Sequence, residues 1–540
     1  MKLALAACLA LALAAPAQGA RFAVGLDPGA DADAVAARLD GRLTREHLAL
    51  GALTLHAPGA AGVARVPGVS WVERLDETRR LAFTPADPLA GRQWYLDQIR
   101  AFSAWEAQPP LAGPLVAVVD SGIDGDHPEF RGRIAEARSF VGGKATTDAH
   151  GHGTFVAGLI AAAHDGKGIA GIAFPSQLLV AKVVQPDGTV SLEAEVAAIR
   201  WAVDRGARVI NLSLGGVRDP LNPSRDTYSP LEAAAVDYAV ARGAVLVAAV
   251  GNADQAPERP WGFASYPSAL PHVIGVSALG RDGSVPAFSD RDRIFNDLSA
   301  PGQEMLSTFP RALSRSGCAN AGYSDCGPEE FRRAEGTSFA APQVTAAAAL
   351  LLAVRPDLRA DQVAYLLTRT AADVSPSTGC RECAAGRDAL SGWGRLDVAN
   401  AVSQAGTGKL PVPDRLETND DAGIRARTLW GPSGRRVEAT IDFWDDQSDV
   451  FRIRLKGSQR LFAALSGPAA AKLSLWRPGT STVDGLSLRV QRMRLVQSRP
   501  RAAQERLAYR VPPRRGGWYY LQVKLGAPGA GTYVLSYAKR

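Results

Sequence analysis

The sequence predicts a multidomain α/β protein in which a parallel sheet carries helices on both faces. Apolar segments of strand length alternate with helical segments over residues 86–405, which is typical of such a sheet. A small α+β unit at 18–85 precedes this region, since strand and helix patterns are mixed there. After a glycine- and proline-bearing linker at 406–413, short alternating segments predict an all-β sandwich over 414–540.

Residues 1–17 have the pattern of a secretory signal peptide. Met1 and Lys2 precede the apolar run Leu3–Ala15, and Ala15-Pro16-Ala17 is a suitable cleavage site. The run is shorter than the roughly 20 residues that span a bilayer, so we expect a secreted protein without a membrane span. Leu5–Cys8 resembles a lipidation site, but the apolar run continues beyond Cys8, which disfavours that alternative.

The α+β unit is expected to begin with a strand at Arg21–Leu26 and a helix at Asp33–Leu39. Two further strands are predicted at Leu48–Leu55 and Val69–Leu75, where apolar residues recur. The segment Arg79–Pro85 then has the composition of an exposed connector. We therefore place the first domain boundary at residue 85.

The central sheet and the sandwich are both predicted from apolar segments. The strands expected in the sheet are Leu115–Val119, Leu178–Val183, Val209–Leu214, Val245–Val250 and Val273–Ser277. Helices are expected at Leu192–Asp204, behind a Ser191 cap, and at Leu231–Arg242, where Gly243 ends the helix. The strands expected in the sandwich are Val450–Leu455, Leu461–Leu465, Lys472–Leu475, Tyr519–Val523 and Tyr533–Tyr537.

Five cysteines occur in the sequence, and loss of the signal peptide removes Cys8. The remaining four form an even set in an oxidising compartment, where disulfides persist. We expect Cys318 to pair with Cys326 and Cys380 with Cys383. A zinc site at Cys380-x-x-Cys383 is the alternative, but the other two cysteines lack the spacing of zinc ligands.

The chain is basic, with a net charge of +7 and a sequence pI near 9.2. Its Lys and Arg residues are mostly dispersed, so we expect no nucleic-acid partner. Nine arginines lie between Arg489 and Arg515. We interpret them as a solvated face offset by the acidic group Asp445, Asp446 and Asp449, with a polyanion-binding patch as the alternative.

Three glycine-bearing stretches carry the residues with catalytic chemistry. Asp120 ends the first apolar strand of the sheet, and catalysis in open α/β sheets gathers at the carboxyl ends of strands. His152 precedes a helix of small residues. Ser338 lies on the first turn of the apolar helix that runs to Val354, where free N–H groups and the helix dipole favour negative charge. Asp, His and Ser follow one another in the order found in subtilisin.

These stretches resemble the signatures of the subtilisin-like serine proteases, the subtilases. The motifs are Asp-Ser-Gly-Ile-Asp at Asp120–Asp124, Gly-His-Gly-Thr-x-Val-Ala-Gly at Gly151–Gly158 and Gly-Thr-Ser-x-Ala-Ala-Pro at Gly336–Pro342. The resemblance covers about residues 93–402. One departure is Phe155, where many relatives carry a second histidine; that position is outside the catalytic triad.

The resemblance implies a subtilisin-like fold and a secreted serine endopeptidase that forms an acyl-enzyme, has broad specificity and processes itself. It implies that Asp120, His152 and Ser338 are the triad and that Asn252 completes the oxyanion hole. Peptide or protein substrates would bind as an added strand and in the primary pocket. The residues implied for substrate binding are Ser213, Leu214, Gly215, Ala249, Val250 and Gly251, with Ser265 near the base of the pocket.

Resemblance to known families also leads to expectations for the two flanking domains and for calcium binding. Pro67–Glu73 is similar to the end of an inhibitory propeptide, so the chain's own residues 18–85 are expected to act as an intramolecular inhibitor. Within residues 414–540, Glu417-Thr418-Asn419-Asp420 and Asp446–Phe451 resemble motifs of the bacterial pre-peptidase C-terminal domain. The chemistry requires no cofactor and no catalytic metal, but structural calcium remains an option at Glu129 and Asp165–Gly168, without an identified N-terminal ligand. We expect a monomer.

Two other function classes are weighed against this one. A binding protein that kept the fold and lost catalysis is disfavoured because Asp120, His152, Ser338 and Asn252 are all present. A narrow processing protease would need an acid at the primary pocket. No acid is evident at Ser265, although Asp254 is close to the pocket segment in sequence.

Overall fold

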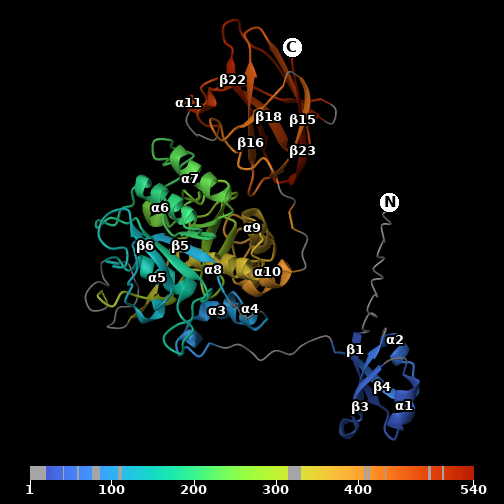
Figure 1. Ribbon diagram of the computed structural model, residues 1–540. Helices are drawn as coiled ribbons and strands as arrows, with labels where there is room; N and C mark the ends of the chain where they lie inside the picture. Colours follow the sequence, from blue (N-terminus) through green and yellow to red (C-terminus); the bar gives the residue numbers. More distant parts are fainter. Residues whose placement is uncertain are drawn as a thin grey trace, which may run out of the picture. The chain divides into compact units, whose positions relative to one another are not determined.

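The computed structural model describes residues 20–39, 42–57, 60–75, 85–107, 112–313, 330–406, 410–411, 414–431, 433–483, 488–501 and 504–540. The chain divides into two compact units, residues 1–82 and 83–540 (Figure 1). The predicted signal peptide, most of the connector and of the 406–413 linker, and the Cys318–Cys326 pair lie outside the described residues.

In its described residues, the first unit is a four-stranded antiparallel sheet in the order β2-β3-β1-β4 with two α-helices. Its elements are β1 Ala20–Leu26, α1 Ala32–Arg38, β2 Arg42–His47, η1 Leu48–Leu50, β3 Ala52–Ala57, α2 Ala60–Val63 and β4 Val69–Arg74. The predicted strand Leu48–Leu55 is wrong in its first half. The chain turns at η1 and at Gly51, whose φ is +58°, and only then enters β3. The sequence did not predict β2, because Arg-Leu-Thr-Arg-Glu-His has no alternation of apolar and polar residues.

The second unit is built on a sheet of seven parallel strands, counted over its described residues, in the order β11-β10-β9-β8-β5-β7-β6. These are β5 Leu115–Asp120, β6 Ile134–Ser139, β7 Gln177–Lys182, β8 Val209–Leu212, β9 Val245–Ala249, β10 Val273–Leu279 and β11 Leu298–Pro301. The five predicted strands are all present, with ends that differ by one or two residues. β6 and β11 were not predicted.

Helices cover both faces of this sheet, as the sequence predicts. They are α3 Trp94–Gln98, α4 Ala101–Ala107, α5 His152–Ala161, α6 Leu192–Asp204, α7 Pro230–Val240, α8 Thr337–Val354, α9 Ala360–Arg369 and α10 Val398–Ala405. Alternate residues of each strand face opposite cores. Val116 and Val118 pack in the core that contains α5 and α8, whereas Ala117 and Val119 pack in the core that contains α6 and α7.

Helix α8 is the central helix of the unit. By length and composition alone it is apolar enough to cross a membrane, the one such helix among the described residues, but 83% of it is buried inside the protein. It packs against β8, β9, β10 and α5 and is therefore a core helix. Pro342 lies inside this helix and has no N–H to donate to the carbonyl oxygen of Ser338, four residues earlier.

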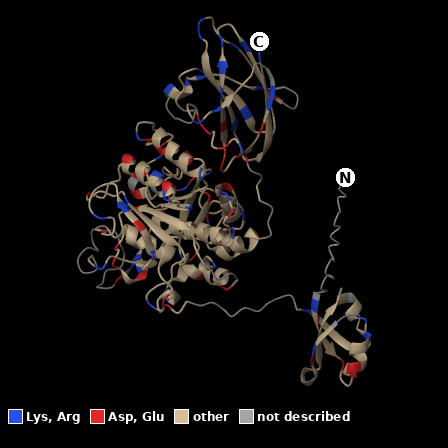
Figure 2. Cartoon of the chain, viewed as in Figure 1, with Lys and Arg blue, Asp and Glu red and all other residues tan. Residues whose placement is uncertain are grey.

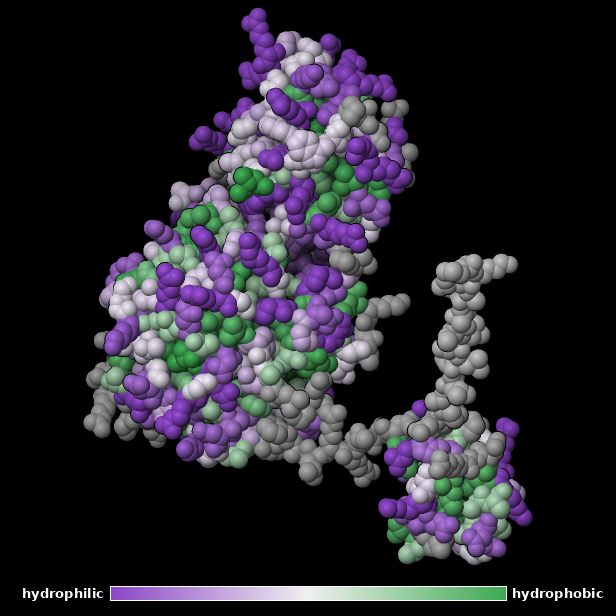
Figure 3. All heavy atoms as spheres, in the orientation of Figure 1, coloured by the Kyte–Doolittle hydropathy of each residue, from purple (hydrophilic) through white to green (hydrophobic). Residues whose placement is uncertain are grey.

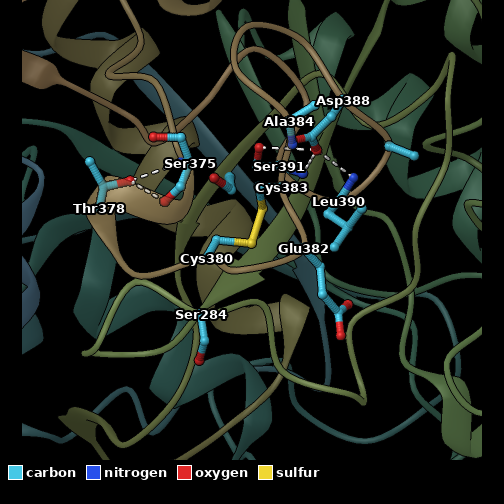
Figure 4. The surroundings of a disulfide bond; sticks show 12 residues. Ser284, Ser375, Thr378, Cys380, Glu382, Cys383, Ala384, Asp388, Leu390 and Ser391 are labelled. Carbon is cyan, nitrogen blue, oxygen red and sulfur yellow. Dashed lines mark hydrogen bonds between the residues drawn. A yellow bond between two sulfur atoms is a disulfide. The ribbon is translucent and has the colours of Figure 1, made fainter.

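A disulfide joins Cys380 and Cys383, whose Cα atoms are 5.4 Å apart (Figure 4). Both cysteines are buried against Leu279 and Val374. The predicted pair is confirmed. Because the two sulfurs are bonded to each other, neither is a thiolate that can bind zinc.

The described residues after the linker form a sandwich of two five-stranded sheets, which confirms the predicted all-β fold of this region. The sheets are β14-β16-β22-β18-β19 and β15-β23-β17-β21-β20, and both contribute to one core. Their strands are β14 Arg427–Leu429, β15 Ser433–Asp442, β16 Ser448–Leu455, β17 Arg460–Ser466, β18 Ala471–Trp476, β19 Arg494–Gln497, β20 Arg499–Arg501, β21 Gln504–Arg510, β22 Gly517–Leu525 and β23 Ala530–Lys539; the helix α11 Leu488–Gln491 precedes β19.

Charge on this domain is unevenly placed. Figure 2 shows its acidic residues gathered at one end, with Lys and Arg spread over the rest, and Figure 3 shows hydrophilic residues spread over the visible face of residues 83–540. The expectation that Asp446 and Asp449 offset the arginines at the surface is wrong. Asp446 is 7% exposed and Asp449 fully buried, where it accepts a hydrogen bond from Tyr533.

Candidate active site

Asp120 and His152 meet at the carboxyl end of the sheet. Asp120 is the last residue of β5 and is 2% exposed. His152 is the first residue of α5, and its Nδ1 lies 2.8 Å from Oδ1 and 2.9 Å from Oδ2 of Asp120. Gly153 permits this approach, because a Cβ there would lie 2.2 Å from the carbonyl oxygen of Gly122. The carboxylate therefore holds the imidazole with Nδ1–H toward it and leaves Nε2 as the basic nitrogen.

The turn that presents His152 is organised by Asp148, a residue that sequence reasoning missed. One oxygen of Asp148 accepts hydrogen bonds from the Ser121 hydroxyl and the backbone N–H groups of His150 and Gly151, at 2.8–3.0 Å. The other accepts two from Thr154. Ser121 in turn accepts from the N–H of Gly153. Asp148 thus ties the end of β5 to the start of α5.

Opposing effects act on the pKa of His152. Burial lowers it, but the charge and hydrogen bond of Asp120, together with the charge of Asp148, outweigh burial and raise the pKa above its usual 6.5. The charged imidazole is therefore stabilised in the folded protein. This is the property required of a general base that becomes an imidazolium during the reaction.

Ser338 is the second residue of α8. Its Oγ lies 3.4 Å from the carbonyl oxygen of Ser213, and the Ser213 hydroxyl donates to the carbonyl oxygen of Ser338 at 2.7 Å. Asn211 continues the connection, because its amide donates to Ser213 and accepts from the Thr345 hydroxyl, both at 2.9 Å. These polar contacts link β8 to α8, and sequence reasoning did not find Asn211 or Thr345.

Asn252 lies next to the start of α8. Its Oδ1 accepts from the backbone N–H and the hydroxyl of Thr337 at 3.0 and 3.1 Å. Its Nδ2 lies 3.6 Å from the position that a Cβ on Gly336 would occupy. The bonds from Thr337 orient the amide, so the Nδ2 donor is held beside the helix start that carries Ser338.

Two segments line the expected substrate site. After β8, Ser213 is buried, Leu214 partly exposed and Gly215 exposed, and Gly216 exchanges backbone hydrogen bonds of 2.8 Å with Tyr266. After β9, Ala249 and Val250 are buried, whereas Gly251 is partly exposed. Val250 is fully buried, and its backbone N–H and carbonyl oxygen already bond to Val276 and Ser265.

Asp254, the acid considered from the sequence, forms an ion pair at the surface. Its side chain is 68% exposed and lies 2.9 Å from the guanidinium of Arg259. Asp254 is therefore paired with Arg259 at the surface.

Glu129 lies against the loop that carries Asp165 and Gly168, and the structure supplies the N-terminal partner that the sequence did not reveal. Asp87 Oδ1 accepts from the N–H groups of Asp165 and Gly166, and Glu129 Oε1 accepts from that of Ile169. The other oxygens, Asp87 Oδ2 and Glu129 Oε2, are buried and accept no hydrogen bond. Burial first, with the charges of Asp165 and Asp87, raises the pKa of Glu129 to about 8.

A second acidic group joins the sandwich to the catalytic part of the unit. His272 Nε2 lies 3.6 Å from Glu417 and 3.5 Å from Asp420. Ligand atoms of Asp414, Glu417 and Asp449 also lie within 4.8 Å of one another. Glu417 Oε1, Asn419 Oδ1 and both Asp420 oxygens are buried without a hydrogen bond. Buried carboxylate and amide oxygens of this kind are the ligands that a hard cation such as calcium prefers.

Comparison with known proteins identifies the central region. The model of the subtilase family matches residues 112–394. Subtilisin DY of Bacillus licheniformis is 34% identical over 267 residues, 49% of this chain and 86% of that protein. Thermitase of Thermoactinomyces vulgaris is 33% identical over 273 residues, 50% of this chain and 85% of thermitase. Fervidolysin of Fervidobacterium pennivorans is 32% identical over 351 residues, 61% of this chain and 46% of fervidolysin.

Proposed function

The chain belongs to the subtilase family of serine proteases, and we propose that it is a secreted endopeptidase with Asp120, His152 and Ser338 as its triad. The observation that carries the proposal is the contact of 2.8 Å between His152 Nδ1 and Asp120, together with the His152 ring lying 5.3 Å, centroid to centroid, from the ring of Phe339, the residue after Ser338. Ser213–Gly215 would pair with the backbone of an extended peptide, so many sequences around the cleaved bond are accepted.

In the proposed reaction, Ser338 Oγ attacks the carbonyl carbon of the scissile bond while His152 Nε2 takes its proton. Asn252 Nδ2 and the backbone N–H of Ser338 hold the oxyanion of the tetrahedral intermediate. The C–N bond then breaks, and His152 gives the proton to the leaving amine. Water attacks the resulting acyl-enzyme by the same route, which releases the acid and restores Ser338.

A fluorophosphonate that labels activated serines tests this assignment. We expect labelling of the mature protein and cleavage of an unstructured protein substrate, and we expect neither in Ser338→Ala. A folded wild-type protein that takes no label and cleaves nothing would instead be a binding protein that lost catalysis.

Self-processing is the second part of the proposal, with residues 18–85 as an inhibitory propeptide. Its support is the compact unit at 1–82 and the connector that follows it. In a protease-deficient host, Ser338→Ala should accumulate as a precursor beginning near Gln18, whereas wild type should begin after the connector. N-terminal sequencing reads both. A Ser338→Ala protein that matures normally would assign the cleavage to another enzyme.

Calcium is proposed as a structural ligand at the two acidic groups, one with Asp87 and Glu129 and one with Glu417 and Asp420. Bound cations would neutralise buried carboxylates that otherwise oppose folding. We expect calcium to raise the melting temperature of inactive Ser338→Ala protein. Added to that background, Glu129→Gln and Asp420→Asn should each remove part of the increase, whereas the exposed control Glu193→Gln should not. An unchanged melting temperature with calcium after chelation would reject both sites.

A further inference from the structure

The wall that carries Asn252 is held between two other segments of the chain. The N–H of Ser265 donates to the carbonyl oxygen of Val250 at 2.7 Å, and the N–H of Asp290 donates to that of Gly251 at 3.0 Å. A bridge between Asn252 and Ser289 extends the second contact. Asp290 is therefore placed by backbone hydrogen bonds directly beside the segment that we assign to the primary pocket.

The side chains of Asp290 and Ser265 both lie close to Gly251, which has no side chain of its own. Its φ is +110°, which an L side chain rarely adopts. A Cβ on Gly251 would lie 2.4 Å from Asp290 Oδ2 and 2.4 Å from Ser265 Oγ. The absence of a side chain at Gly251 thus allows the Asp290 carboxylate, and the Ser265 hydroxyl that the sequence placed near the base of the pocket, to lie directly against this wall.

Asp290 has no cationic partner among the described residues. It is 1% exposed, and its Oδ1 accepts no hydrogen bond. The neighbouring charges are directed elsewhere: Arg291 pairs with Glu382 at 3.5 Å and Asp292 with Arg218 at 2.9 Å.

This environment opposes ionisation of Asp290. Burial first, and the negative charge of Asp254 second, raise the pKa of Asp290 to about 8. An isolated buried carboxylate lowers stability unless a cation joins it, and one carboxylate with one hydroxyl falls short of the 6–8 oxygens that calcium takes.

We propose that Asp290 determines specificity by receiving the ammonium or guanidinium group of a Lys or Arg side chain immediately N-terminal to the cleaved bond. The inference rests on the proposed function, because it takes residues 249–251 as the wall of the primary pocket. The substrate would bring the cation that the folded chain does not supply. The enzyme would then accept many residues where it binds only the peptide backbone, and it would prefer Lys or Arg immediately N-terminal to the cleaved bond.

Selectivity should depend on pH in a defined direction. In the free enzyme Asp290 is protonated below about pH 8, so a cationic side chain must displace that proton. The opposing charge of Asp254 acts in the same sense, since it favours the protonated carboxyl. The preference for Arg over an uncharged residue should therefore increase from pH 6 to pH 9.

The test uses three peptides that differ only at that position: Arg, its neutral isostere citrulline, and Phe. We expect kcat/KM in the order Arg, citrulline, Phe for the mature wild-type enzyme. Asp290→Asn, which keeps size and shape, should lower kcat/KM for the Arg peptide about 10²-fold and bring Arg and citrulline together. It should change the Phe peptide less than about threefold. Asp254→Asn is the matched control: because the charge of Asp254 favours the protonated form of Asp290, this variant should keep or increase the Arg-to-citrulline ratio and should not lower it.

The outcomes distinguish failure of the role of Asp290 from failure of the proposed protease function. If wild type takes the fluorophosphonate and cleaves the Phe peptide but treats Arg and citrulline alike, the role of Asp290 is rejected and the protease stands. Loss of the Arg preference in Asp254→Asn alone would assign it to Asp254 and also reject Asp290. If no peptide is cleaved and no label is taken, the proposed function itself fails. Labelling of Asp290→Asn together with intact Phe cleavage shows that this variant is folded.

Discussion

Two buried aspartates of the α/β domain differ in what surrounds them. Asp120, at the end of β5, is 2% exposed and accepts hydrogen bonds from His152 and from the backbone N–H of Ser121. Asp290, beside the segment that follows β9, is 1% exposed, and its Oδ1 accepts none. The same residue type at the same depth has a partner in one place and lacks one in the other.

This difference separates two uses of a buried charge. A carboxylate with partners orients a neighbour and stabilises its charged form, as Asp120 does for His152. A carboxylate without partners destabilises the fold, and such groups persist where function needs them. Replacement of Asp120 should therefore damage catalysis for every substrate, whereas replacement of Asp290 should change substrate choice and relieve the fold.

The largest expected effect is that of Asp120→Asn, which removes the partner that selects the imidazole tautomer. We expect kcat to decrease about 10⁴-fold for Arg and Phe peptides alike, with KM nearly unchanged. Steady-state kinetics on both peptides measures this. A loss confined to the Arg peptide would make Asp120 a binding residue and would erase its contrast with Asp290.

The next effect in size is expected for Asn252→Ala. Asn252 follows Gly251, which lies against Asp290, and it contacts Thr337, which precedes Ser338. The oxyanion depends on this donor more than the uncharged carbonyl does, so kcat should decrease and KM should not. The expected size is about 10²–10³-fold, a magnitude known from a subtilisin rather than derived from this structure. Arg and Phe peptides should lose equally, and an unchanged kcat would leave Asn252 as a turn residue only.

A pH profile of kcat/KM for the Phe peptide sharpens the role of Asp120. The neutral imidazole is the base, and Asp120 raises the pKa of His152, so activity should increase with pH through a midpoint above 6.5. In Asp120→Asn the lowering effect of burial remains, and the midpoint of the residual activity should move down. Asp290→Asn should leave the profile in place, and a shift of the same size there would show that the two sites are coupled.

The smallest expected effect is on stability, measured as the melting temperature of Ser338→Ala protein carrying a second change. Asp290→Asn should raise it by about 1–2 °C, which corresponds to roughly 1 kcal/mol in a domain of this size. The pKa of Asp290 is raised from 3.8 in the unfolded chain to about 8, so the folded form keeps a proton that the unfolded form releases. Wild-type stability decreases over that window as pH rises, and the advantage of Asp290→Asn should grow from pH 4 to 8. Asp120→Asn should lower the melting temperature, and a decrease in Asp290→Asn would remove the contrast.

The sequence by itself determined where the reactive groups lie, because each belongs to a short local pattern. Asp120 ends an apolar strand, His152 follows a glycine turn, and Ser338 opens an apolar helix. The helix Leu192–Asp204 has the predicted bounds, and its Ser191 cap accepts from the N–H of Ala194. Such features depend on residues within one or two turns of each other. The domain boundaries and the catalytic roles remain predictions.

Only the tertiary structure decided which polar side chains serve those groups. Asp87 meets the N–H of Asp165, 78 positions away, and Asp290 meets Gly251 through the chain that returns after β10. Asp148 is nearer in sequence, but its bond to Ser121 still depends on how β5 and α5 are placed. An aspartate in a loop has the same local sequence pattern whether it caps a turn at the surface or is buried against a distant strand. Whether such an aspartate is exposed or buried depends on which strand ends are neighbours. That is set by the strand order β11-β10-β9-β8-β5-β7-β6, which no local sequence pattern contains.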